Sequence, residues 1–364
     1  MSILGGNDIL FLLGAGASKE AGLLTAEDMI RDLETKVTGR GRKWPKYRDL
    51  YFCVKSALLY ADGVQGRFDN PGSFNIERLV NAMRELEQNE EHPVYPFVAS
   101  WNMKLQEYGG VRFEHIREFR RLILSELVRK WVHLRRRNAA DYYKGIVAFQ
   151  GEWGAPLHVF SLNYDLCLER ACDTEDCRLE RGFLSDDEGR TWEWRRFEDE
   201  DLTQSQIYLF KMHGSLDWTR NDLQQLTFDD DPEDPDDVDT IDLIFGTNYK
   251  LSYRDPYLYY IYSFRRYALE AKLLICVGYG FQDPHVNEIL CQALRQDTTK
   301  QVLAVTFSSS DDGEAAEQAQ IADILGVPKA RVSVQCNGAQ SFFLETLKKD
   351  LVQTLGPKRR ADPF

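Results

Sequence analysis

The stretch that decides the fold is Ile9-Leu10-Phe11-Leu12-Leu13-Gly14-Ala15-Gly16-Ala17-Ser18, an apolar run that ends in a glycine turn. An uninterrupted apolar run of this length predicts a strand that is buried on both faces, as in a parallel sheet. The two glycines allow a tight turn and a close approach of phosphate groups to the backbone. The turn is not a full dinucleotide-binding fingerprint, because Lys19 stands where a third glycine would be. Taken alone, it is as typical of a structural turn as of a phosphate site.

Three further apolar runs end in the same way. They span residues 157–162, 207–212 and 273–277, and the motifs that follow them are Asn163-Tyr164-Asp165, His213-Gly214-Ser215 and Gly278-Tyr279-Gly280. If all four runs are strands of one parallel sheet, their motifs meet at its carboxyl edge, where open α/β sheets bind ligands. The sequence therefore predicts an α/β fold with a doubly wound, Rossmann-like parallel sheet and a nucleotide site at that edge.

The polar motifs suit chemistry at a ribose, but each also has an ordinary structural explanation. Asparagine and aspartate often cap helices, so Asn163 and Asp165 fit a cap as well as a ligand contact. An isolated histidine is more often structural than functional. The position of His213, directly after a buried strand and level with Asn163 and Asp165, favours a role in proton transfer.

Between residues 38 and 149 the alternation of strands and helices stops, and helical periodicity replaces it. One apolar stripe follows Asn75, a plausible helix cap, and a second runs from Phe113 to Trp131. Upstream, Thr25 and Asp28 form the pattern of a capping box for a helix that starts at Ala26. The sequence therefore predicts a helical insertion domain, residues 38–149, within an α/β domain made of residues 1–37 and 150–364.

Composition excludes several classes of protein. The 364 residues carry a formal charge of -13, which argues against direct, sequence-independent binding of nucleic acid, although local basic patches remain compatible with it. Seven cysteines without a Cys-x-x-Cys pair fit a reducing cytosol and predict neither disulfides nor a bound zinc. No apolar stretch approaches the roughly 18 residues of a membrane helix, so a cytoplasmic location is expected. The acidic stretch 229–242 is typical of a solvated loop.

Together, the four motifs resemble those of the sirtuin-like NAD-consuming proteins in their order and in their placement after strands. The sequence is particularly similar to the bacterial sirtuin-like NAD hydrolases of antiphage defence. It shares with them the segment Lys211-Met212-His213-Gly214-Ser215-Leu216-Asp217-Trp218, the turn Gly278-Tyr279-Gly280-Phe281-Gln282-Asp283-Pro284 and a helical insertion. The resemblance covers roughly residues 7–37 and 155–355.

The resemblance implies a role for each motif around bound NAD. Asn163 and Asp165 would hold the nicotinamide ribose and the attacking water, and His213 would be the general base. The remaining residues would bind the pyrophosphate and the adenosine ribose; they are Gly14, Ala15, Gly16, Ser18, Gly278, Tyr279 and Gly280. NAD is thus expected as the substrate, with no metal among the site residues.

Departures from the protein deacylases favour water as the acceptor. After Gly22, Leu23-Leu24-Thr25 replaces the segment that deacylases place over the nicotinamide ribose, and their four-cysteine zinc module is missing. The prediction is therefore an NAD hydrolase that releases nicotinamide and ADP-ribose. An NAD-dependent deacylase or ADP-ribosyltransferase, and a non-catalytic sensor of NAD or ADP-ribose, are the alternatives.

The resemblance also carries expectations about partners. Proteins of this kind commonly work inside larger assemblies, which implies a homo-oligomer and, in some systems, a separately encoded ATPase beside it. Neither a membrane nor direct contact with nucleic acid is expected.

Overall fold

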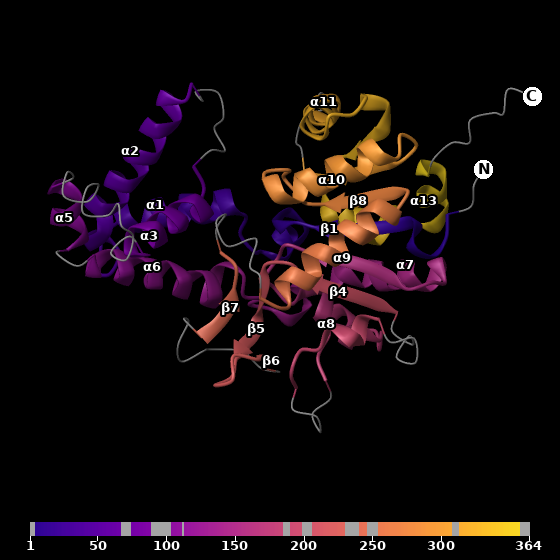
Figure 1. Cartoon of the computed structure of the whole chain (residues 1–364), viewed down its shortest axis with the longest axis horizontal. Coiled ribbons are helices and arrows are strands. Elements are labelled where there is room, and N and C mark those ends of the chain that lie inside the picture. Colours follow the sequence, from indigo (N-terminus) through magenta and orange to yellow (C-terminus); the bar gives the residue numbers. More distant parts are fainter. Residues whose placement is uncertain are drawn as a thin grey trace, which may run out of the picture.

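The computed structural model describes residues 4–66, 74–88, 103–110, 113–184, 190–198, 206–229, 240–245, 254–307 and 313–356. The described chain forms two lobes, one purely helical and one built on a large sheet (Figure 1). The first strand belongs to the sheet lobe, the next segment forms the helical lobe, and the chain then returns to the sheet.

The large sheet has seven parallel strands in the order β10-β9-β8-β1-β2-β4-β3. The strands are β1 (Ile9–Leu13), β2 (Leu157–Ser161), β3 (Leu179–Glu180), β4 (Ile207–Lys211), β8 (Leu273–Val277), β9 (Gln301–Val305) and β10 (Val332–Gln335). From β1 the chain passes to β2, then to the edge strand β3, and returns to β4 between them. It then crosses to β8 on the other side of β1. The topological switch point of the sheet therefore lies between β1 and β8.

The four strands named from the sequence are neighbours and end in register. Leu13 pairs with Ser161 on one side and with Val277 on the other, and Ser161 pairs with Lys211. The motifs that follow these strands consequently leave the sheet side by side at one edge. The predicted doubly wound α/β fold is confirmed.

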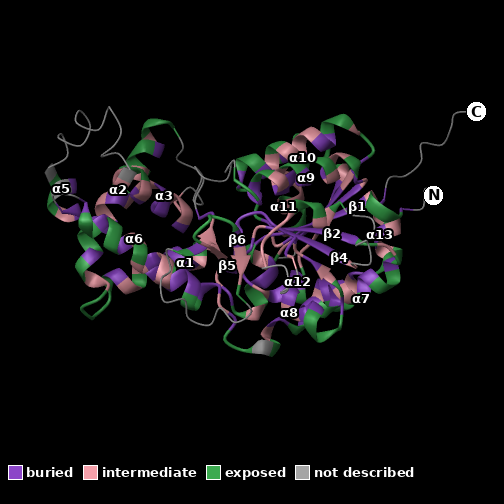
Figure 2. Ribbon diagram, turned by 60° about the horizontal axis from the view of Figure 1, so that its bottom comes forward, coloured by how far each residue is buried: buried purple, intermediate pink, exposed green. Residues whose placement is uncertain are grey.

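Helices cover both faces of this sheet because successive strand residues point to opposite sides. Phe11 and Leu13 join one buried cluster, and Leu10 and Leu12 join the other. The first face carries α7 (Lys144–Trp153), α8 (Cys167–Thr174), α12 (Gly338–Ser341), the π-helix η14 (Phe342–Thr346) and α13 (Lys349–Leu355). The second face carries α9 (Tyr257–Glu270), α10 (Pro284–Gln296) and α11 (Gly313–Leu325). The strands β1, β2, β4 and β8 between them are buried along their length (Figure 2).

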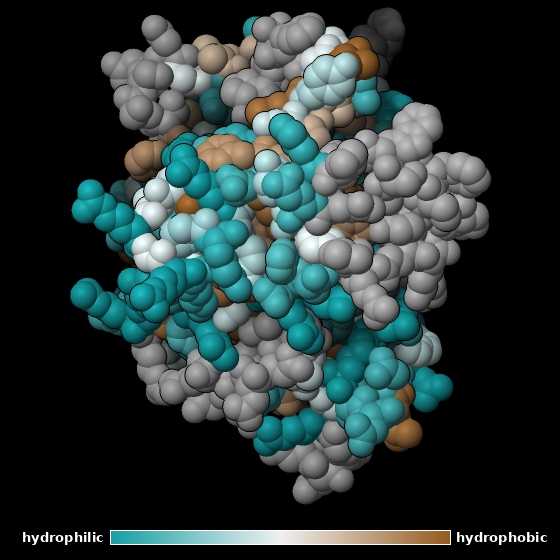
Figure 3. All heavy atoms as spheres, turned by 90° about the vertical axis from the view of Figure 1, so that its left-hand side faces the viewer, coloured by the Kyte–Doolittle hydropathy of each residue, from teal (hydrophilic) through white to brown (hydrophobic). Residues whose placement is uncertain are grey.

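The helical lobe is built around its own apolar cluster. Its elements are α1 (Ala26–Thr38), α2 (Arg48–Val64), α3 (Ile76–Gln88), α5 (Met103–Gly109), α6 (Glu114–Glu126) and the π-helix η6 (Leu127–Trp131). The capping box is confirmed, since Thr25 and Asp28 bond each other's backbone N–H at 3.3 Å. Asn75 accepts a hydrogen bond from the Arg78 N–H at 2.9 Å, as expected of a cap. Hydrophilic side chains gather on the described part of the lobe's outer face (Figure 3).

The buried clusters do not follow the residue numbers proposed for the two domains. Helix α1 packs into the helical lobe although it precedes residue 38, and α7 packs on the sheet although most of it precedes residue 150. The helical cluster also includes Tyr164, from the second site motif, and Leu216, which directly follows the third. The boundaries at residues 38 and 149 stay a prediction, but packing shows where the lobes meet.

A small antiparallel sheet begins directly after His213. Its order is β6-β5-β7, formed by β5 (Gly214–Arg220), β6 (Leu226–Phe228) and β7 (Ile241–Leu243). Most of the acidic stretch 229–242 lies outside the described residues. Short 3-10 helices complete the chain: η1 (Gly6–Asp8), η2 (Ala15–Ala21), η3 (Pro45–Tyr47), η7 (Arg137–Tyr143), η9 (Trp194–Phe197) and η13 (Lys329–Arg331). Within the described residues, none of the helices has the length and apolarity to span a membrane.

Candidate functional site

The glycine turns after β1 and β8 are in direct contact at the switch point. The Gly14 N–H donates to Val277 O and the Gly16 N–H to Gly278 O, both at 2.9 Å. A Cβ at Gly14 would lie 2.6 Å from Gly278 O, which is closer than atoms can approach. Gly278 has a positive φ of 62°, and a Cβ there would overlap the backbone of Ala17. These glycines are therefore explained by the contact between the turns, whether or not a phosphate binds there.

Other residues predicted to bind NAD differ in how accessible they are. Ala15 is exposed, and space remains around Gly280, where an added Cβ would meet its first neighbour at 4.0 Å. Ser18 is buried and bonds the Tyr143 hydroxyl at 2.8 Å. The Tyr279 hydroxyl donates to Asn287 Oδ1 at 2.7 Å. Ala15 and Gly280 are thus open to a ligand, whereas Ser18 and Tyr279 support the turns from within.

Asn163 links the second strand to the first glycine turn. Its side-chain Nδ2 donates to Gly14 O at 3.0 Å and to Ser18 Oγ at 3.3 Å. The side chain is buried, and these bonds direct it toward the turn and not toward the start of α8. The helix-cap interpretation therefore does not describe Asn163, whose carboxamide lies at the switch point.

Asp165 does act as a cap. Its Oδ1 accepts a hydrogen bond from the Cys167 N–H at 3.0 Å, at the start of α8. Its backbone carbonyl accepts a bond from the Lys211 ammonium group. One carboxylate oxygen is thus occupied by the helix, and a ligand contact of this residue stays a prediction.

Lys211 was not identified from the sequence as a site residue. Its side chain is only 2% exposed, and its Nζ lies 3.2 Å from Oε1 of Glu169, which is buried on α8. Burial raises the pKa of Glu169, while Lys211 opposes that shift. The sequence did contain a sign of this pair, because Lys211 stands at the end of an apolar strand. A charged side chain that is buried there needs a partner of opposite charge.

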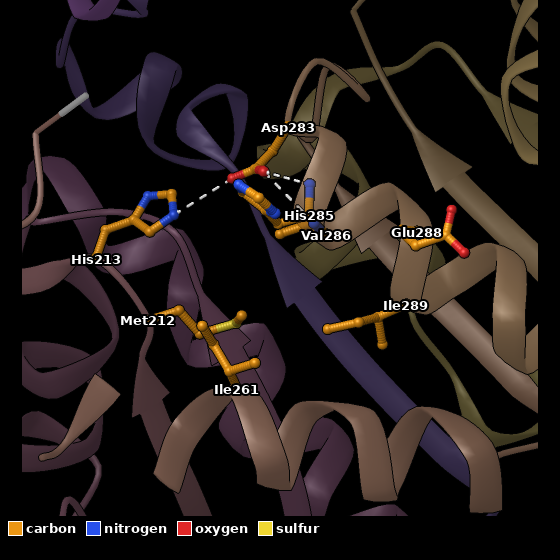
Figure 4. A pocket seen from close by; sticks show the side chains of 8 residues that line it. All are labelled: Met212, His213, Ile261, Asp283, His285, Val286, Glu288 and Ile289. Carbon is orange, nitrogen blue, oxygen red and sulfur yellow. Dashed lines mark hydrogen bonds and ion pairs between the residues drawn. The ribbon is translucent and has the colours of Figure 1, made fainter. Parts of the chain in front are cut away.

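His213 is paired with a carboxylate from the fourth motif. It is 6% exposed, and its Nε2 lies 3.5 Å from Asp283 Oδ2 (Figure 4). The other oxygen of Asp283 caps α10, accepting from the His285 N–H at 3.0 Å and the Val286 N–H at 3.4 Å. Asp283 is fixed by the helix and so holds one nitrogen of His213 in place. Asp283 was noted in the sequence as part of the turn after Gly278, but no role was predicted for it. The pair Asp283-Pro284 is nevertheless typical of the start of a helix.

A cavity of about 200 Å³ lies beside this pair. It opens between α9, α10 and the end of β4 (Figure 4). Its lining is apolar apart from the two histidines and two carboxylates: Met212, His213, Ile261, Asp283, His285, Val286, Glu288 and Ile289. The lining includes neither Asn163 nor Asp165. His213 and Asn163 therefore leave neighbouring strands at one sheet edge, but His213 borders this cavity while Asn163 is turned to the glycine turn.

No group of three or more histidine, cysteine, aspartate or glutamate side chains in the described ranges is arranged to hold a metal ion. Cys167, Cys172 and Cys177 belong to the apolar cluster on the α7–α8 face. Burial raises the pKa of the Cys167 thiol well above its usual value, which keeps it protonated. The absence of zinc stays a prediction from the sequence.

A doubly wound sheet with glycine turns at its switch point is the arrangement of nucleotide-binding α/β proteins. Residues 157–325 match the family model of the SIR2-like domain, a match that supports a sirtuin-like family. The match contains the Asn163, His213 and Gly278 motifs, whereas the glycine turn after β1 lies before it. SIR2-like domains bind NAD, so the match is compatible with NAD-related catalysis. No curated protein matches the sequence.

Proposed function

We propose that this protein hydrolyses NAD to nicotinamide and ADP-ribose at the carboxyl edge of the sheet. The observation that carries the proposal is the meeting of four motifs there, with Gly14 and Gly278 in contact at the switch point and Asn163 bonded to Gly14. The strands β1 and β8 belong to different halves of the doubly wound sheet. Such sheets bind nucleotides where their two halves meet.

In the proposed reaction the bond between C1′ of the ribose and the ring nitrogen of nicotinamide breaks. Its electron pair goes to the nitrogen, so nicotinamide leaves neutral and the ribose passes through an oxocarbenium-like state. The oxygen of a water molecule bonds to C1′ and gives up one proton. The products are nicotinamide, ADP-ribose and that proton.

His213 is the proposed acceptor of the proton. A general base needs a lone pair at one ring nitrogen, and a carboxylate beside the other nitrogen fixes the orientation of the ring. Asp283, 3.5 Å from Nε2, is placed to do this, which leaves Nδ1 as the basic atom. Asn163 and Asp165 would hold the ribose and the water, as the resemblance implies.

The wider role we propose is depletion of NAD during bacterial antiphage defence, in a homo-oligomer and with activity gated by assembly or by a partner such as a separately encoded ATPase. The support for this role is the resemblance of the motifs alone. Cleavage of a common cofactor would need such control, because an always active NAD hydrolase would harm its own cell.

Incubation of the purified full chain with NAD, followed by chromatography of the products, tests the proposal. The reactions are run with the chain alone and with the protein encoded by the neighbouring gene added, and we expect equal amounts of nicotinamide and ADP-ribose in at least one of them. A parallel reaction with an acylated peptide distinguishes a deacylase, which would form O-acyl-ADP-ribose. Binding of NAD without nicotinamide release in every reaction would contradict the proposal and favour a sensor.

A further inference from the structure

The segment that returns from the helical lobe to the sheet reaches into the glycine turn. This segment is η7, and its last two residues, Tyr142 and Tyr143, are both buried. The Tyr142 hydroxyl donates to Ala17 O at 2.7 Å, and the Tyr143 hydroxyl lies 2.8 Å from Ser18 Oγ. Two hydroxyl groups from outside the four motifs therefore hold the turn.

Tyr143 belongs to a chain of hydrogen bonds that ends at Asn163. Ser18 Oγ bonds both the Tyr143 hydroxyl and Asn163 Nδ2, and the same Nδ2 donates to Gly14 O. Burial raises the pKa of the Tyr143 hydroxyl well above its usual value, so it keeps its proton and stays neutral at physiological pH. The orientation of the Asn163 carboxamide thus depends on Ser18, and that of Ser18 depends on Tyr143.

We propose that Tyr143 is a positioning residue for the reaction, acting through Ser18 on Asn163. The inference rests on the proposed function and adds a residue that neither the motifs nor the family match assigns. A network of buried hydrogen bonds is rigid only when each member is satisfied. Loss of the Tyr143 hydroxyl would remove the 2.8 Å bond to Ser18 Oγ and leave Ser18 held on that side only by the longer bond from Asn163 Nδ2, at 3.3 Å. The position of the Asn163 carboxamide would then be less closely fixed.

The chain just before η7 is anchored in the helical lobe through Trp131, the last residue of η6. Trp131 O accepts a hydrogen bond from the Leu24 N–H at 3.0 Å, just after the glycine turn. The indole Nε1 of Trp131 donates to Asp32 on α1 at 2.7 Å. Residues 131–143 thus connect the helical lobe to the end of the turn, at Ala17 and Ser18, and to Leu24 beyond it. Tyr143 therefore lies where the lobe and the proposed site meet.

The ring of Tyr143 has a packing role that must be separated from the role of its hydroxyl. Its centroid lies 5.0 Å from that of Tyr142 and 5.2 Å from that of Phe343. The substitution Tyr143→Phe keeps these ring contacts and removes only the oxygen. Tyr47→Phe is a matched control, because the buried Tyr47 ring stacks on Phe119 and its hydroxyl donates to Glu118 at 3.0 Å, in the helical lobe.

The first measurement is NAD turnover per folded molecule. We expect Tyr143→Phe to lower kcat at least about tenfold and to change KM less than about threefold, since one misplaced group commonly has effects of this size. Tyr47→Phe should stay within about twofold of the wild type. The double variant Tyr143→Phe, Ser18→Ala should be no worse than its worse single variant, because both act along one path.

The second measurement does not depend on activity. Amide hydrogen exchange of peptides covering residues 14–22, without ligand, should be faster in Tyr143→Phe and unchanged in Tyr47→Phe. Unchanged exchange there in Tyr143→Phe would overturn the inference, whatever NAD assays give. Faster exchange in a protein that releases no nicotinamide would support the positioning role and contradict only the hydrolase.

Discussion

The segment 38–149, which forms most of the helical lobe, differs from the rest of the chain in charge and in what it contributes to the proposed site. Residues 38–149 contain 20 lysines and arginines against 13 aspartates and glutamates, a formal charge of +7, so the charge of -13 for the whole chain leaves -20 for the rest. The acidic part supplies all four site motifs. The basic part supplies none, yet its apolar cluster includes Tyr164 and Leu216, which lie next to Asn163 and near His213.

The proposed site therefore depends on two kinds of residue. One kind sits at strand ends and would contact NAD. The other kind is buried behind the motifs, as Lys211 and Tyr143 are, and fixes their positions. Substitutions of the first kind should affect chemistry without unfolding the protein, whereas those of the second should affect stability or order as well.

The largest effect expected is loss of activity when a motif residue changes. His213→Ala or Asn163→Ala should reduce nicotinamide release by about 10²- to 10⁴-fold, the range for removal of general acid–base catalysis. Stability should fall by no more than about 1 to 2 kcal/mol, as is usual for single substitutions. Turnover is measured on the folded fraction after circular dichroism.

The double variant of Asn163 and His213 should be scarcely worse than either single variant, because both groups act on one transition state. Near-normal NAD hydrolysis by folded His213→Ala would contradict the proposed mechanism, in which His213 is the general base. Loss of folding with normal turnover per folded molecule would instead assign both residues to structure.

The next effect is on stability and compares a buried ion pair with a surface pair. Lys211→Met would leave Glu169 buried without its cation, at a cost of about 3 to 5 kcal/mol in the free energy of unfolding. Lys46→Met breaks the exposed pair with Glu118 in the helical lobe and should cost less than about 1 kcal/mol. Urea denaturation of both variants gives the comparison.

A double variant, Lys211→Met with Glu169→Leu, should recover much of the loss, because no unpaired charge remains buried. If Lys211→Met alone costs no more than Lys46→Met, the pair does not support the site in the way described.

A smaller effect, which depends on pH, comes from His158 on β2. Burial, aided by Arg266, lowers its pKa from 6.5 to about 4 in the folded protein. The unfolded chain therefore binds the proton first, and the contribution of His158 to stability is complete above pH 6.5 and is lost as the pH falls toward 4. The lowered pKa corresponds to about 3 kcal/mol.

His158→Phe should keep the stacking on Tyr267, whose ring centroid lies 3.9 Å away, and remove this proton linkage. The fall in the free energy of unfolding between pH 7 and pH 4.5 should then be smaller than in the wild type by a few kcal/mol. Equal slopes for the two proteins would show that His158 is not buried in its neutral form.

The smallest effect should come from the acidic stretch. Replacement of residues 229–239 by a glycine–serine linker of the same length removes eight carboxylates from the acidic part and keeps the connection from β6 to β7 across β5. An acidic segment of this kind cannot contribute to an apolar core. The change in stability should be below about 1 kcal/mol. Differential scanning calorimetry of the chain with the replaced segment checks this, and a larger loss would make the stretch structural.

The sequence predicted the sheet well because strands buried on both faces leave uninterrupted apolar runs. The limits of β1 and β8 match the predicted runs, and those of β2 and β4 differ by one residue. Periodicity also identified α3 and α6 in the basic part, but it gave no separate prediction of α2 or α5, nor of which lobe α1 would join. That choice depends on contacts between segments distant in sequence, which local patterns do not contain.

The proposed site was predictable only as far as strand ends determine it. Four motifs after four parallel strands must share an edge, and they do. The partners of those motifs come from elsewhere: Asp283 reaches His213 across 70 residues, and Tyr143 reaches Ser18 across 125. Side-chain pairs of this kind leave no mark in spacing or composition.

The contact between Gly14 and Gly278 restricts the substitutions that these two positions can tolerate. Neither position has room for a single extra methyl group, because the two turns touch through their backbones. In a saturation library selected only for soluble expression, with no requirement for activity, both positions should remain glycine. Invariant glycines in these turns would then reflect the packing of the two halves of the sheet against each other. They would not by themselves be evidence that a nucleotide binds there.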